Sequence, residues 1–145
     1  MNSMIKFLLT ILTAIVFYGT ATAGIVEEHK LVIQVNTEEA KNQEIALNYA
    51  VNVLNHYEPG EVKVEIVAHG AGISLLSKSR KNKFTSRIES LVKSGIVFSV
   101  CNNSINDIEK KYRKKPEIIE GVKIIPDGTV RIMRLQEKGY SYIRP

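Results

Sequence analysis

Apolar positions along the chain follow two alternating spacings, one typical of strands and one typical of helices. Residues 30–36 and 96–101 are short β-branched runs, and residues 61–68 alternate apolar side chains against Lys63 and Glu65. The run 96–101 is apolar at nearly every position, as expected of a strand covered on both faces. Strands are therefore predicted at residues 30–36, 61–68, 96–101, 121–125 and 140–143.

Between these strands the apolar side chains recur at helical spacing. The predicted helices begin at Thr37, Ile73, Asn82, Ser104 and Thr129. The first has a capping threonine and an acidic first turn, which suit the positive end of the helix dipole. Asn82 is predicted to cap its helix, and Ser104 with Asp107 fits the spacing of a capping box.

Strand and helix alternate to the end of the chain. This order predicts an α/β protein whose mostly parallel sheet carries helices on its faces. No repeat, low-complexity segment or long linker divides residues 24–145, so we expect a single domain.

The first 23 residues read as a targeting segment. Lys6 precedes the apolar run 7–17, and small residues end in Ala21-Thr22-Ala23. This pattern is typical of a secretory signal peptide. The run is shorter than the roughly 20 residues that a membrane-spanning helix needs, although an uncleaved anchor stays open. We expect residues 1–23 to be removed, leaving residues 24–145 periplasmic or secreted, with no membrane span after cleavage.

The chain is moderately basic, with a formal net charge of +5. Two basic groups stand out, residues 78–81 and residues 110–115. Both lie around predicted helix termini with few aromatic side chains among them. A solvated face or the rim of an oligomer is favoured over a nucleic-acid surface, so no nucleic-acid partner is expected.

The chain has one cysteine, Cys101, and therefore no disulfide partner within itself. It ends the predicted strand 96–101 directly before a helix. Free N–H groups and the positive dipole end at such a position stabilise a thiolate, which is the reactive form. The alternative is that Cys101 is an inert packing residue. Position alone leaves the two open.

Further candidates follow from the rule that ligands of open α/β sheets sit beyond the carboxyl ends of the strands. His69 ends the second strand and could orient or deprotonate Cys101 if the two strand ends are neighbours. It could equally be only a polar residue finishing a strand. Candidate ligand-binding residues at the same strand ends are Asn36, Gly70, Gly72, Asn102, Asn103 and Ser104.

Several other chemistries have no sequence signature. His29, His56 and His69 lack metal-ligand spacing, and one cysteine cannot build a zinc site. The chain has no nucleophile elbow, phosphate loop or dinucleotide fingerprint, and no Cys-x-x-Cys for dithiol exchange. We therefore expect neither a metal nor a cofactor.

Four segments together resemble the DsrE/DsrF-like family, which is named for intracellular sulfur oxidation. They are residues 31–39, 67–73, 97–103 and 135–145, in family order along the whole predicted domain. The resemblance implies a three-layer α/β/α domain with about five strands, and assembly into homotrimers or hexamers.

The resemblance also implies roles for two residues. Cys101 stands where sulfur-relay members carry a persulfide, and His69 matches the family's His-Gly turn. Two departures affect the expected site. Sulfur-relay members work in the cytoplasm, whereas this chain carries a predicted export signal, and Asn102-Asn103-Ser104 stands where relatives often have Asn-Thr.

Three functions are compatible with these features. The first is a sulfur carrier that accepts a sulfane sulfur on Cys101 and passes it between a donor and an acceptor protein, which is at most a transferase. The second is a non-catalytic oligomeric module that binds a small ligand or a partner in a cleft near His69 and Cys101. The third is a redox sensor in which Cys101 is oxidised or pairs between chains.

Overall fold

A computed structural model describes residues 28–145, so the predicted signal peptide, residues 1–23, lies outside the described residues. Five strands form one sheet in the order β4-β3-β2-β1-β5. All four neighbouring pairs are parallel, which confirms the predicted sheet. The strands are β1 (His29–Val35), β2 (Val62–Ala68), β3 (Val97–Cys101), β4 (Lys123–Ile125) and β5 (Ser141–Ile143).

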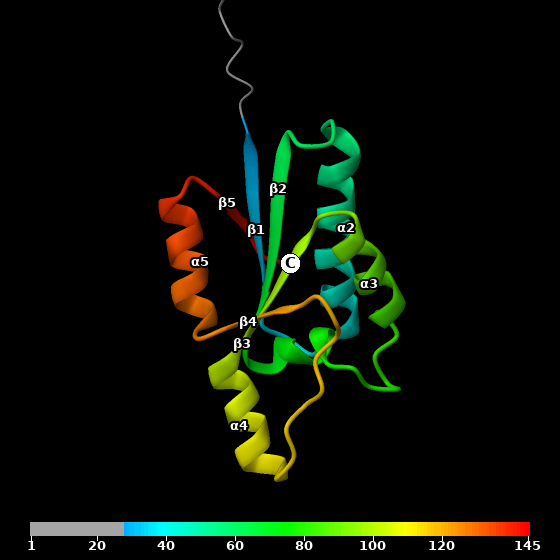
Figure 1. Cartoon of the computed structure of the whole chain (residues 1–145), viewed down its shortest axis with the longest axis vertical. Coiled ribbons are helices and arrows are strands. Elements are labelled where there is room, and N and C mark those ends of the chain that lie inside the picture. Colours follow the sequence, from blue (N-terminus) through cyan, green and yellow to red (C-terminus); the bar gives the residue numbers. More distant parts are fainter. Residues whose placement is uncertain (1–27) are drawn as a thin grey trace, which may run out of the picture.

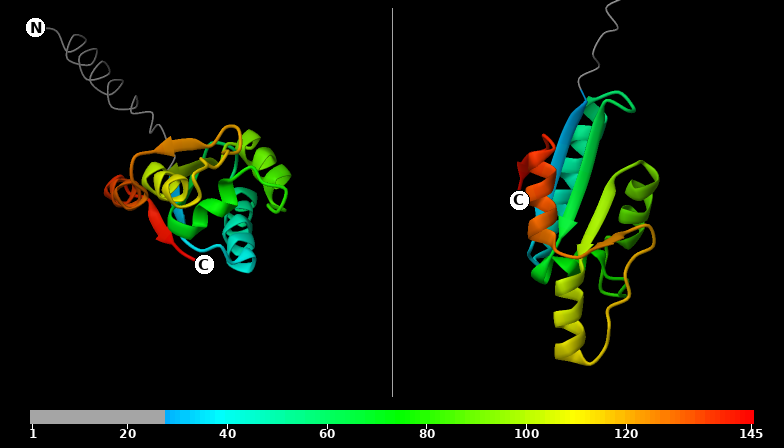
Figure 2. Two further views of the ribbon diagram at one scale, coloured as in Figure 1. Left: turned by 90° about the horizontal axis from the view of Figure 1, so that it is seen from below. Right: turned by 60° about the vertical axis from the view of Figure 1, so that its left-hand side comes forward.

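Helices cover both faces of this sheet. The helices of the described residues are α2 (Ala40–His56), the 3-10 helix η2 (Gly70–Leu76), α3 (Thr85–Lys93), α4 (Asn102–Tyr112) and α5 (Gly128–Glu137). Figure 1 shows α2 and α3 on one side of the sheet and α5 on the other, which gives the expected three layers. The helix α4 extends beyond the carboxyl edge of the sheet instead of lying along a face (Figure 2).

The two faces differ in how much apolar surface they bury. Alternate side chains of β2, including Val64 and Ile66, join a large core beneath α2, η2 and α3. The opposite face holds a much smaller core beneath α5, formed by Val32, Val67, Ile132 and Leu135. Because buried apolar area supplies most of the stabilisation, α5 is the more weakly held layer.

The α5 face also contains a buried ion pair. Glu65, a charged residue in the alternating strand β2, is only 3% exposed. Its carboxylate accepts hydrogen bonds from the Ser99 hydroxyl at 2.7 Å and from Arg131 Nε and Nη2 at 2.8 and 2.7 Å. Glu65 is buried because α5 covers this face of β2, and Arg131 of α5 supplies the countercharge.

None of the three residues predicted to cap a helix is the N-cap residue of that helix. The helix α2 begins at Ala40, and the Thr37 hydroxyl accepts a hydrogen bond from the Glu39 N–H before that helix starts. Phe84, not Asn82, is the N-cap residue of α3, although Asn82 Oδ1 accepts a hydrogen bond from the Phe84 N–H at 3.0 Å. The Asn82 side-chain amide donates to the carbonyls of Ser74, Leu75 and Ser77 and so ties the loop to η2. Ser104 lies inside the first turn of α4 and bonds to another segment.

The turn after β2 is packed closely against the end of β1. A Cβ atom on Gly72 would lie 2.1 Å from the Val35 carbonyl oxygen, so only glycine fits there. The 3-10 helix begins at Gly70, three residues before the predicted helix start at Ile73. Among residues 28–145, no helix combines the length and the apolar character needed to cross a bilayer.

Candidate functional site

The three strand ends singled out in the sequence are neighbours in the sheet. Val35 of β1 pairs with Ala68 of β2, and Ala68 pairs with Val100 of β3. One residue further along β2 and β3, His69 and Cys101 stand opposite one another. Adjacent strands lie about 4.8 Å apart, so these two side chains begin about one strand spacing from each other.

Gly128, the first residue of α5, lies against both of these side chains. A Cβ atom at Gly128 would be 2.8 Å from His69 Cβ and 3.4 Å from Cys101 Cβ. His69 and Cys101 therefore share one small space beneath the start of α5, which any side chain at position 128 would invade.

Cys101 itself is largely buried, with 4% of its surface exposed. It is the N-terminal flanking residue of α4, and no side chain caps that helix. The sulfur thus lies at the start of α4 and beneath the start of α5.

His69 is held by hydrogen bonds that cross the sheet. Gln34 of β1 places its amide Nε2 2.6 Å from His69 Nε2. The Tyr142 hydroxyl of β5 in turn donates to Gln34 Oε1. Because an amide nitrogen can only donate, this arrangement makes His69 Nε2 the acceptor and puts the proton of the neutral ring on Nδ1.

The surroundings of His69 also favour the neutral ring. Partial burial lowers the pKa of His69 below its ordinary value, and the positive charge of Arg144 lowers it further, against an opposing contribution from Asp127. The His69 ring is therefore neutral at pH 7, consistent with the acceptor role of its Nε2.

Asp127 fixes the start of α5 above this pair. Its carboxylate accepts from the Val130 N–H at 2.9 Å and from the Asn103 side-chain amide at 3.1 Å. These hydrogen bonds, the backbone one first, lower the pKa of Asp127. Asn103 thus connects the first turn of α4 to the first turn of α5.

The remaining predicted ligand-binding residues have other contacts. The Gly70 N–H donates to the Ser104 hydroxyl at 2.7 Å, so Ser104 links the turn after His69 to α4. The Asn36 backbone lies against Gly72, within the close approach described above. Asn102 is the half-buried first residue of α4.

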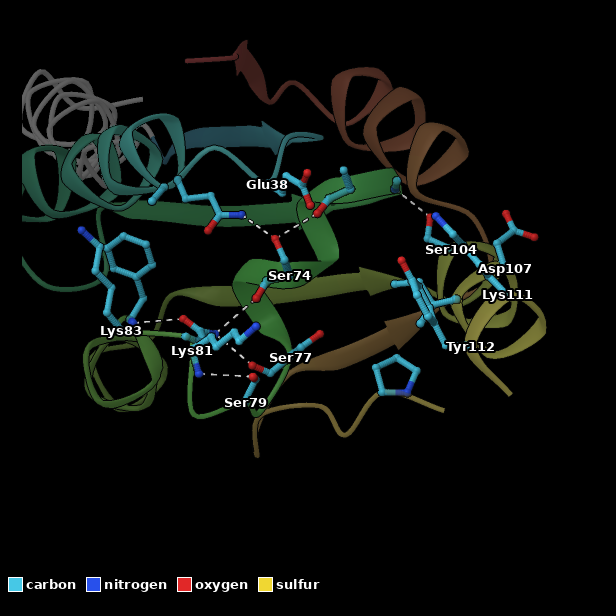
Figure 3. Close-up of a pocket in the computed structure, with 18 residues that line it drawn as sticks. Glu38, Ser74, Ser77, Ser79, Lys81, Lys83, Ser104, Asp107, Lys111 and Tyr112 are labelled. Atoms are coloured by element: carbon cyan, nitrogen blue, oxygen red, sulfur yellow. Dashed lines mark hydrogen bonds between the residues drawn. The ribbon is translucent and has the colours of Figure 1, made fainter. Parts of the chain in front are cut away.

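A cavity of about 800 Å³ lies next to these segments, between the starts of α2 and α4 and the turn after η2. Gly70 and Ser104 line it, but His69 and Cys101 do not. In Figure 3, Ser74 lies between Lys81 and Lys83 on one side and Lys111 and Tyr112 on the other. The predicted residues are therefore divided between a buried thiol site and a separate open cavity.

Sequence reasoning missed three residues of the thiol site: Gln34, Asp127 and Gly128. A glutamine within the apolar run 30–36 was a usable signal, because a buried amide needs partners. The segment 126–128 was read only as a turn. Within residues 28–145, no three His, Cys, Asp or Glu side chains come together as metal ligands could.

The fold and site define a class: a parallel α/β domain with a lone cysteine at the junction of a central strand and the following helix. The family model described as DsrE/DsrF-like matches residues 29–145. The chain belongs to the DsrE/DsrF-like family.

Two solved structures share this fold. The protein of unknown function MTH1491 from Methanobacterium thermoautotrophicum is 23% identical with a TM-score of 0.71, covering 81% of this chain and 100% of its own. The conserved protein of unknown function BT1422 from Bacteroides thetaiotaomicron is 18% identical with a TM-score of 0.54, covering 79% and 92%. No curated protein matches the chain.

Proposed function

We propose that this protein is a sulfur carrier of the DsrE/DsrF-like family in which Cys101 holds the transferred sulfur as a persulfide. The observation that carries the proposal is the pairing of Cys101 with His69 beneath Gly128, at the start of α4. Family membership supports a sulfur-relay role, and the single cysteine leaves one thiol that could fill it.

The transfer is a thiol exchange. The Cys101 thiolate attacks the outer sulfur of a persulfide on a donor; a new S–S bond forms on Cys101, and the donor leaves as a thiolate. An acceptor thiolate then attacks the outer sulfur held by Cys101, and the Cys101 thiolate is released. Atoms and electrons balance in both steps without a metal or cofactor.

The surroundings of the sulfur suit an anion that must be held without reacting prematurely. The start of α4 offers backbone N–H groups to an anionic persulfide, and the neutral His69 ring adds no competing base when its Nε2 accepts from Gln34. Burial at 4% exposure limits contact with oxidants in bulk water. The same burial requires the start of α5 to move during transfer.

Intact-mass measurement after incubation with polysulfide tests the proposal directly. The native protein is expected to gain about 32 Da per sulfur, and the gain should disappear on adding a reducing thiol. Cys101→Ser should gain nothing. Native protein that keeps its mass while guanidine-unfolded protein reacts, or equal uptake by Cys101→Ser, would overturn the proposal.

We also propose that the protein is exported and works as a homo-oligomer, a trimer or hexamer. The N-terminal pattern of residues 1–23 supports export. Exposed apolar side chains at Ile124, Met133 and Tyr142 support burial against another copy.

Each of these two proposals has its own test. Export predicts mature protein starting at Gly24 in a periplasmic fraction, and oligomerisation predicts a trimer or hexamer in sedimentation at micromolar concentration. An uncleaved cytoplasmic chain or a monomer would refute them.

A further inference from the structure

Lysines from the two basic segments of the sequence, residues 78–81 and 110–115, line the same cavity. Lys81 and the adjoining Lys83 line the 800 Å³ cavity from one side, and Lys111 lines it from α4. Figure 3 shows these lysines around the same hollow, although the segments are about thirty positions apart in sequence. A cationic rim on a cavity, unlike a basic stretch on an open helix, is a feature of a binding site.

Not all of this charge is neutralised within the protein. Lys83 lies 3.5 Å from Glu44, but no ion pair forms at Lys81 or Lys111 within residues 28–145. Two carboxylates, Glu38 and Asp107, also line the cavity, and Asp107 lies 3.9 Å from Lys110. The lining therefore contains three ammonium groups against two carboxylates. Within residues 28–145, Lys81 and Lys111 have no carboxylate partner, and the Lys111 ammonium lies 5.1 Å from the centre of the Tyr112 ring.

The wall between these charges is partly apolar. Phe84, Ile108, Tyr112 and Pro116 contribute to it from three different segments. A volume of about 800 Å³ lies within the roughly 300–1,000 Å³ of small-molecule sites, which combine apolar walls with a few polar groups.

A buried amide supplies an unused acceptor. Gln43 is 5% exposed and lines the cavity. Its Nε2 donates to the Thr37 carbonyl at 2.9 Å and to the Ser74 hydroxyl at 2.8 Å. In the described part of the chain nothing donates to its Oε1, yet no fully enclosed side-chain polar atom there lacks a partner. Gln43 Oε1 is therefore not fully enclosed, and since Gln43 lines the cavity, this oxygen is the acceptor that a ligand N–H or O–H would use there.

We propose that this cavity binds a small organic anion that has an apolar body and a hydrogen-bond donor. The anionic group pairs with Lys81 or Lys111, the apolar body packs against Phe84, Ile108 and Tyr112, and the donor bonds to Gln43 Oε1. The site is separate from the thiol site, because neither Cys101 nor His69 lines the cavity. It touches the thiol site only through Gly70 and Ser104.

The fluorescent probe 8-anilinonaphthalene-1-sulfonate has these three features, and N-phenyl-1-naphthylamine is the same molecule without the sulfonate. We expect the folded protein to bind the sulfonate saturably and the neutral probe about tenfold more weakly. The double variant Lys81→Glu/Lys111→Glu should lose about tenfold in sulfonate affinity, since each exposed charge contributes a modest amount. The control is the double variant Arg134→Glu/Lys138→Glu, which makes the same charge change at two exposed positions at the end of α5. It should bind the sulfonate like the native protein.

The proposal would be overturned if the native protein bound both probes equally or bound neither. It would also be overturned if the Lys81→Glu/Lys111→Glu variant bound the sulfonate as tightly as the native protein does. Should that variant fold poorly, amide chemical shifts of the native protein decide: changes must centre on Ala71, Ser74 and Asn82. Changes centred elsewhere would also overturn it. Repeating the titration with Cys101→Ser separates this site from the sulfur-carrier proposal, because probe binding should persist without the thiol.

Discussion

At the scale of single residues, His69 is the group on which most of the thiol site depends. It contacts β1 through Gln34, faces Gly128 at the start of α5, and stands opposite Cys101 on β3. Its half-buried ring stays neutral because burial penalises the charged form. If His69 Nε2 were protonated, its N–H would face the Gln34 Nε2 amide, which is also a donor. The charged ring would therefore lose the hydrogen bond to Gln34.

The lowered pKa of His69 predicts how stability depends on pH. The unfolded chain takes up this proton near pH 6.5, whereas the folded protein takes it up only at lower pH. The folded state is therefore favoured above pH 6.5, and the free energy of unfolding should fall as the pH drops below that value. The loss attributable to Asp127, whose pKa is also lowered, should begin only below about pH 4.

Urea unfolding at pH values between about 7.5 and 5 measures this dependence. In His69→Gln, which keeps a polar side chain beside Gln34, the fall between pH 6.5 and 5 should become shallower. His29 and His56 are present in both proteins and serve as internal controls. Identical slopes in the two proteins would show that His69 is not the group responsible.

The sequence was sufficient to place Cys101 and His69 at one edge of the sheet, because strand ends in a parallel sheet share an edge; their role in a site stays a prediction. It was not sufficient for Gln34 or Gly128. Gln34 acquires its role only through Tyr142, which lies more than a hundred positions further along the chain. Gly128 is required because α5 approaches two strand ends at once, and no local pattern records that approach.

At the scale of elements, the ion pair between Glu65 and Arg131 holds α5 on the sheet. Four apolar residues form the core on this face, so the pair supplies a large share of what positions the helix. By fixing α5, it also fixes Gly128 over Cys101. Arg131 is accordingly a positioning residue for the thiol site.

Replacing Arg131 by methionine should lower the free energy of unfolding by about 2–3 kcal/mol, because it leaves the Glu65 carboxylate buried with one neutral donor. This is less than the roughly 3–5 kcal/mol lost when a fully buried ion pair is broken, because the Arg131 side chain is 32% exposed. Alkylation of native Cys101 by iodoacetamide should become faster at the same time. Urea unfolding and labelling kinetics measure the two effects.

Arg134→Met, one turn further along α5 and exposed, is the matched control and should change neither quantity appreciably. The double variant Glu65→Leu/Arg131→Met should recover part of the lost stability, since no unpaired charge is then buried. If Arg131→Met behaves like Arg134→Met, the ion pair does not hold the helix.

The order and type of most elements could be predicted from the sequence, whereas their ends could not. Hydrophobic spacing identified β1, β2 and β3 because a strand buried on one or both faces must carry apolar side chains in a fixed period. This reason does not extend to β4 and β5, which are short edge strands with mostly exposed side chains. Caps depend on which partner a short polar side chain finds. Asn82 accepts one local hydrogen bond, from the Phe84 N–H, but its side-chain amide donates back to carbonyls at the end of η2. Ser104 fits a local capping pattern, but its hydroxyl accepts from Gly70, 34 positions earlier in the chain.

At the scale of the whole molecule, the unequal faces divide the domain into a strong part and a weak part. The layer formed by α2, η2 and α3 shares the large core with β1, β2 and β3, whereas α5 is held by the small core and one ion pair. Local opening therefore begins at α5, because free energies of partial unfolding follow buried contacts. This is also the movement that exposes Cys101.

Amide hydrogen exchange should resolve these two parts. Amides of α5 are expected to exchange through a partial opening that costs less free energy than the opening of β1 and β2. Arg131→Met should speed exchange in α5 more than in β2. The rate of Cys101 alkylation should follow the α5 opening, because both depend on the same displaced helix. If the amides of α5 were as well protected as those of β2, α5 would not open separately. If Cys101 were alkylated much faster than α5 exchange allows, the sulfur would be reached by another route. Either result would mean that α5 does not control access to Cys101.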